Sequence, residues 1–144
     1  WEVAMRGMKK SLCFLGACLL CLGLTSCAAA EQDAFQVQII CRSSGIQQIF
    51  WSCYLDGVFY GSGGMADLDG EELTAESELV PCFSRAYLDG ADPIGFSIDF
   101  SPYAEGRTTP LGTTDQVSIP AQYGACYTVI LSGDEATGFQ AELQ

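Results

Sequence analysis

The sequence predicts an all-β fold, an antiparallel β-sandwich of seven or eight short strands. Apolar and polar residues alternate with a period of two in several segments, and glycine-containing turn signals separate these segments. No segment has the apolar spacing of a convincing long helix. Short strands at this spacing are typical of a sandwich rather than of a parallel α/β sheet, and a small barrel is the alternative architecture.

Three alternating segments give the clearest strands. Each predicts a half-buried antiparallel strand whose apolar set faces the core. The apolar sets are Phe35, Val37, Ile39 and Cys41; then Ile94, Phe96, Ile98 and Phe100; then Phe139, Ala141 and Leu143.

Glycine-containing turns predict how some strands are joined. Asp56-Gly57 separates strands at 49–55 and 58–61, as in a two-residue type I′ hairpin, and Leu55 should then face Val58. A turn at 43–45 is expected to pair the first strand with the second as another hairpin.

The rest of the domain holds a third hairpin and one doubtful segment. Strands at 123–132 and 138–143 are expected to pair through the loop 133–137. The segment 71–80 permits a short helix across the sandwich.

An export signal precedes the strands. Three basic residues lie before an apolar stretch of 13 residues, Leu12 to Leu24, and small residues follow as far as Ala30. This is the layout of a secretory signal, and an apolar stretch of about 10–14 residues is more typical of such a signal than of a membrane span. The basic residues are Arg6, Lys9 and Lys10.

The end of this signal, Leu24-Thr25-Ser26-Cys27, resembles the lipobox of bacterial lipoproteins. In that family the cysteine is lipidated and becomes the first residue of the mature chain. The resemblance implies that Cys27 carries an acyl lipid, which palmitate labelling would detect. This lipid would anchor the protein in a bilayer of the bacterial cell envelope. Ordinary signal cleavage, with a soluble secreted product, is the alternative.

These signals divide the chain. We expect residues 1–4 to be untranslated leader, because their codons can include a ribosome-binding sequence just before Met5. Residues 5–26 are then the signal peptide, 27–34 a tether and 35–144 the sandwich domain.

The charge and the residue types restrict the function. From Cys27 onward the chain has 17 acidic residues against three arginines, a formal charge of −14. This charge repels nucleic acid, so DNA and RNA are excluded as partners. The chain has no histidine, which removes Ser-His-Asp triads, Cys-His dyads and most catalytic zinc sites. A small envelope hydrolase using paired carboxylates remains the alternative function.

Four cysteines follow the anchor: Cys41, Cys53, Cys82 and Cys126. An even number in an exported chain favours two disulfides. The hairpin expected around residues 43–45 holds Cys41 away from Cys53 and favours a bond from each of them to Cys82 or Cys126. A bond between Cys82 and Cys126 is the first one to test, because it would join the middle of the chain to its closing hairpin. Buried free thiols are an alternative, whereas the spacing does not favour zinc.

One acidic stretch is a weak calcium candidate, through Asp67, Asp69, Glu71 and Glu76. Met65 occupies the position where a calcium-binding loop needs its first carboxylate, so the helix-loop-helix form of such a site fails. A looser carboxylate site and a solvated acidic loop remain, and no other cofactor is expected.

Aromatic residues gather in the Asp56-Gly57 hairpin. Alternation places Trp51 in the core with Ile49, Cys53 and Leu55. If the segment 71–88 leaves the opposite face open, the remaining aromatics are a candidate platform for a glycan or a protein ligand. They are Phe50, Tyr54, Phe59 and Tyr60.

The closing segment 123–131 and its hairpin resemble the final strands of immunoglobulin-like surface domains. The resemblance concerns architecture alone, because the Cys-Trp-Cys spacing of true immunoglobulin domains is absent. Because the chain has no histidine and no identifiable nucleophile setting, we expect a non-catalytic binding or adhesion module.

Overall fold

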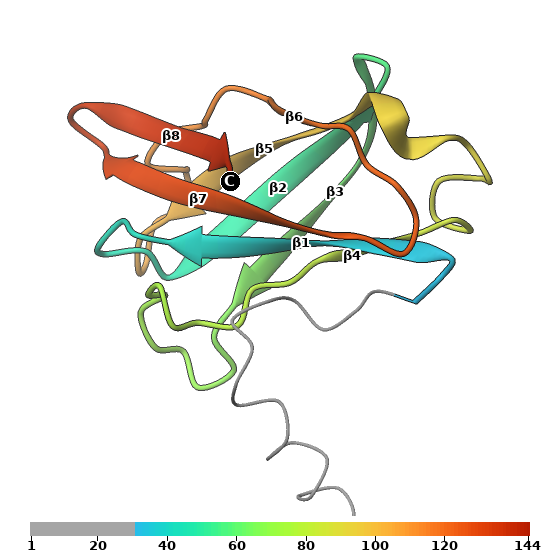
Figure 1. The fold of residues 1–144 in the computed structure, drawn as a ribbon. Helices are drawn as coiled ribbons and strands as arrows, with labels where there is room; N and C mark the ends of the chain where they lie inside the picture. The colour runs from blue at the N-terminus through green and yellow to red at the C-terminus, as the bar shows by residue number, and fades with distance from the viewer. Residues whose placement is uncertain (1–30) are drawn as a thin grey trace, which may run out of the picture.

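Eight strands and one 3₁₀ turn form the part of the chain that the computed structural model describes, residues 31–144 (Figure 1). None of the helices within these residues is long and apolar enough to cross a membrane. The elements are β1 (Ala34–Cys41), β2 (Gln48–Leu55), β3 (Val58–Ala66), β4 (Cys82–Ser84), η1 (Pro93–Gly95), β5 (Phe96–Tyr103), β6 (Val117–Ile119), β7 (Cys126–Asp134) and β8 (Gly138–Leu143).

The strands form two four-stranded sheets. One has the order β4-β1-β7-β8 and the other β3-β2-β5-β6. The predicted all-β sandwich is confirmed, with eight strands. One pair departs from antiparallel pairing, since β1 and β7 run parallel from Gln36 opposite Cys126 to Cys41 opposite Leu131.

An aromatic cluster forms the centre of the core between the sheets. Phe35 of β1 is fully buried, with its ring 5.3 Å from that of Phe83 and 4.9 Å from that of Phe96. Trp51 of β2 reaches the same cluster, with its ring 5.1 Å from that of Phe83. Side chains from four strands therefore meet at one point, which ties the two sheets together.

The hairpin between β2 and β3 forms as predicted. Asp56 and Gly57 have φ angles of 51° and 78°, the left-handed pair that a type I′ turn requires, and Leu55 faces Val58. A β-bulge interrupts the register between Cys53 and Tyr54. The bulge lets Tyr60 leave the alternation of β3.

The expected hairpin between the first two strands is wrong. β1 lies in one sheet and β2 in the other, so the turn at Gly45 carries the chain across the sandwich. Ile39 and Ile49 are both buried, and their strands contribute to the core from opposite layers. Alternation identifies the buried face of each strand but does not say which sheet the strand joins.

The segment 71–80 forms no helix. Leu73 and Leu79 are buried, and backbone hydrogen bonds hold each of them: the Leu73 N–H donates to Ile46 O, and the Leu79 carbonyl accepts from Ile39 N. The second bond extends the pairing of β4 along β1. Anchoring at both ends draws the segment out along the sandwich, which overrides its modest helix propensity.

Candidate functional site

The outer face of the β3-β2-β5-β6 sheet carries four aromatic side chains, Phe50, Tyr54, Phe59 and Tyr103, which we call the aromatic face. Alternation puts Phe50 and Tyr54 of β2 on the side opposite the buried Ile49 and Cys53. Phe50 is 45% exposed and Phe59 is 58% exposed. The segment 71–88 therefore does not cover this face, and large apolar groups stay in contact with solvent.

The four rings form two pairs. Phe50 and Tyr103 meet edge to face with ring centroids 5.1 Å apart, and Tyr54 and Phe59 do so at 6.0 Å. Since Phe50 and Tyr54 are four residues apart on one strand, roughly 13 Å separates the pairs along the sheet. Edge-to-face contacts of this kind restrict the rings, so the face presents a preformed surface.

Small polar groups lie between the two aromatic pairs. Ser52 pairs with Asp99, and Phe50 pairs with Ser101, in the register of β2 and β5. The Tyr54 hydroxyl donates to Asp99 Oδ2 at 2.8 Å, and this hydrogen bond raises the pKa of Tyr54. The Ser101 hydroxyl lies 2.8 Å from that of Thr113. The aromatic face thus combines apolar rings at its ends with hydroxyl and carboxylate groups at its centre.

Tyr60 does not join the aromatic face. Its ring packs beside that of Tyr87, and its hydroxyl donates to Asp89 Oδ2 at 2.6 Å. This hydrogen bond raises the pKa of Tyr60 to about 12. Three of the four predicted platform residues are brought together, while the β-bulge directs Tyr60 toward the partly buried side of the hairpin.

Tyr103 belongs to the aromatic face but is absent from the sequence prediction. It faces Gln48 at the end of β5, where Pro102 is buried. The signal was present, because the alternation of Phe96, Ile98 and Phe100 continues through Pro102 and leaves Tyr103 on the outer side.

The expected bond between Cys82 and Cys126 is wrong. Both residues lie opposite Gln36, on the two sides of β1. Two strand spacings, roughly 10 Å, separate them, and a disulfide needs Cα atoms within about 7 Å. Cys41, Cys53 and Cys82 are free thiols. Cys126 is disulfide-bonded, and none of these three residues is its partner.

The three free thiols differ in accessibility, which predicts selective alkylation. Cys41 and Cys53 are at most 1% exposed, and burial raises the pKa of both thiols. Cys82 is exposed. We expect iodoacetamide to label Cys82 in the native chain and to label Cys41 and Cys53 only after denaturation, because the thiolate is the reactive species. Peptide mapping measures this, and equal native labelling of all three would contradict the buried placement.

The acidic calcium candidates lie in the loop after β3. Asp67 accepts hydrogen bonds from the backbone N–H of Asp69 at 2.8 Å and of Glu71 at 3.4 Å, so its carboxylate closes a local turn. Within residues 31–144, no three cysteine, aspartate or glutamate side chains gather as a group suited to a metal ion. Asp67, Asp69, Glu71 and Glu76 are therefore not brought together.

The lipidation candidate Cys27 lies outside the described residues. A scan of the chain against models of known protein families finds no match, and a search of curated proteins finds none either.

Proposed function

We propose that this protein is a non-catalytic binding or adhesion module of the bacterial cell envelope, anchored to the bilayer by a lipid at Cys27 and binding a glycan on the aromatic face. The open aromatic face of the β3-β2-β5-β6 sheet carries the proposal. The lipobox-like sequence at residues 24–27 supports the location.

The chemistry of the aromatic face suits a sugar chain. A sugar ring has an apolar C–H face that packs against aromatic rings, and its hydroxyl groups need hydrogen-bond partners. Phe50 and Tyr103 supply the first contact at one end of the face, and Tyr54 and Phe59 supply it at the other. Asp99 and the serines between them supply acceptors and donors. A ligand longer than one ring can contact both pairs.

Glycan-array screening of the purified chain, followed by calorimetric titration of the best glycan, tests the proposal. We expect Phe50→Ala and Tyr103→Ala each to weaken binding about tenfold, because each removes a ring from the same pair. Tyr54→Phe keeps the ring but removes the hydrogen bond to Asp99, so its effect should be smaller.

A matched control is Leu143→Ala. Leu143 is 37% exposed in β8, which belongs to the other sheet, and its truncation should leave binding unchanged. Absence of glycan binding, or equal binding by wild type and Phe50→Ala, would overturn the proposal. Binding of a protein through the same residues would replace the glycan by a protein ligand.

A further inference from the structure

Strand β3 is a long sheet edge that lacks the usual protection against pairing beyond its β-bulge at Tyr60, from Gly61 to Ala66. Within the described chain it pairs with β2 alone, so its other edge has no strand partner. Natural edge strands are commonly short, charged or interrupted by proline. β4 and β6 have three residues each, and β8 carries Glu142, whereas β3 has nine residues with no charge and no proline.

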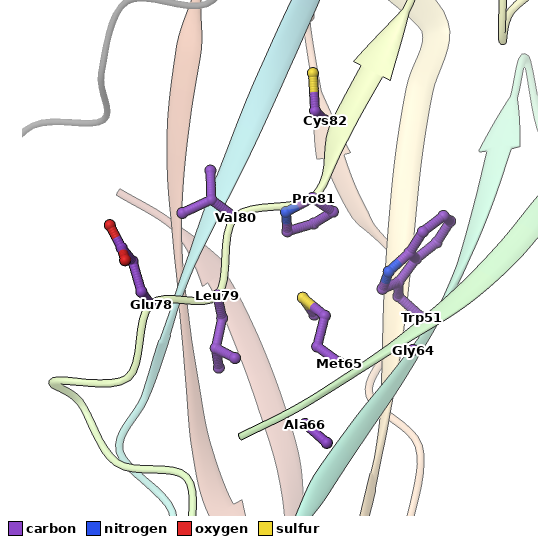
Figure 2. Close-up of a pocket in the computed structure, with 9 residues that line it drawn as sticks. All are labelled: Trp51, Gly64, Met65, Ala66, Glu78, Leu79, Val80, Pro81 and Cys82. Carbon is purple, nitrogen blue, oxygen red and sulfur yellow. The ribbon is translucent and has the colours of Figure 1, made fainter. Parts of the chain in front are cut away.

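Two cavities lie on the two sides of this edge at the same three residues, Gly64–Ala66. The larger, of about 480 Å³, lies between β3 and the segment 78–82. Figure 2 shows Met65 and Trp51 on one side of it, with Leu79, Val80 and Pro81 on the other. The smaller, of about 240 Å³, is bordered by Gln48 and Phe50 on the outer side of the sheet.

Exposure along this part of β3 alternates in the same way. Gly63 and Met65 are half-buried, whereas Gly64 and Ala66 are exposed. A strand added beside β3 would direct alternate side chains to the two faces of the sheet. The added strand's side chains on one face would enter the larger cavity, and those on the other face would lie beside the smaller cavity. Main-chain hydrogen bonds then supply affinity, and the cavities supply selectivity for side chains.

We propose that the free edge of β3 is a strand-addition site for an extended polypeptide segment with apolar side chains and flanking lysine or arginine residues. The site adjoins the aromatic face at Phe50, which borders the smaller cavity, but it does not depend on glycan binding there.

The charge around the edge identifies this occupant. The loop 67–78, which leaves the end of β3, contains six acidic residues and no basic one: Asp67, Asp69, Glu71, Glu72, Glu76 and Glu78. Glu78 also lines the larger cavity. A basic segment is attracted to this loop, whereas a second copy of this acidic chain brings charge of the same sign. The free backbone N–H and C=O groups of β3 select for a polypeptide strand, and the apolar walls of the larger cavity select for apolar side chains on it.

Hydrogen–deuterium exchange of the full chain in detergent, with and without a synthetic peptide, tests the proposal. The probe is acetyl-Lys-Lys-Thr-Val-Thr-Leu-Thr-Lys-amide, and the matched probe has glutamate in place of each lysine. We expect the basic peptide to slow exchange of the backbone amides in 61–66, and the acidic peptide to bind at least about tenfold more weakly.

Two variants locate the site. Met65→Lys places a charge inside the larger cavity and should weaken the basic peptide at least about tenfold. The matched control Leu68→Lys makes a similar apolar-to-lysine change at a fully exposed position of the adjacent loop and should have a much smaller effect. Val80→Lys, on the opposite wall, repeats the test if Met65→Lys does not fold.

Three results would overturn the proposal: no protection of 61–66 by the basic peptide, equal binding of the two peptides, or equal effects of Met65→Lys and Leu68→Lys. Protection of the same amides that rises with protein concentration, without peptide, would also overturn it, because a second copy would then be the occupant.

Discussion

Replacing Phe35 by alanine is expected to lower the free energy of unfolding by about 3–5 kcal/mol, the range for large aromatic-to-alanine changes in cores. Phe35 has no exposed surface, and the rings of Phe83, Phe96, Tyr123 and Tyr127 surround it with centroids 4.9–6.3 Å away. The cavity left by its removal would lie where the two sheets meet. Since small domains have a total stability of about 5–15 kcal/mol, this one change can remove a large share of it.

Urea unfolding followed by circular dichroism measures the effect. Phe59→Ala is the matched control, because it makes the same change at a side chain that is 58% exposed, and we expect a loss of no more than about 1.5 kcal/mol from its ring contact with Tyr54. Equal losses for the two variants would mean that the aromatic cluster around Phe35 is not the centre of the core.

Local features of the fold were predictable because short-range chemistry determines them. Asp56-Gly57 supplies the two left-handed positions that a two-residue hairpin needs, and the structure has both. Alternation likewise placed Phe35 and Ile98 in the core and Phe50 on the outer face.

The assignment of strands to sheets was not predictable from the same patterns. β1 and β2 are separated by six residues, yet they lie in different sheets, while β1 pairs with β7 from the far end of the chain. Both pairings bury the same apolar faces, so alternation does not distinguish them. The expected bond between Cys82 and Cys126 was wrong for the same reason, because the patterns do not show that β1 lies between the strands that carry these two residues.

The aromatic face was partly predictable for a similar reason. Phe50, Tyr54 and Phe59 lie within one local hairpin, and their side of the sheet follows from alternation. Tyr103 reaches them through the pairing of β2 with β5, a contact between distant parts of the sequence. The β-bulge that turns Tyr60 away from the aromatic face depends on the register of β2 and β3, which the residue types alone do not encode.

The second large effect concerns the anchor. We expect Cys27→Ala to abolish palmitate labelling and to release the protein from the membrane fraction, or to leave an uncleaved precursor. The domain itself offers little attraction to a bilayer, since two of its three arginines, Arg85 and Arg107, are paired with Asp33 and Glu135. Stable anchoring by lipid normally needs two signals, either two acyl chains or one acyl chain together with a polybasic patch. With a formal charge of −14 from Cys27 onward, the chain repels anionic lipid head groups.

Cys82→Ala is the matched control for this test, because it removes an exposed free thiol of the folded domain by the same substitution. Labelling with a palmitate analogue and membrane fractionation should give the wild-type result for Cys82→Ala. Cys27→Ala should lose the label, and it should either leave the membrane fraction or run at the size of the uncleaved precursor. Persistent labelling of Cys27→Ala would refute lipidation at this residue. Persistent membrane association without labelling would mean that another part of the chain holds it at the bilayer.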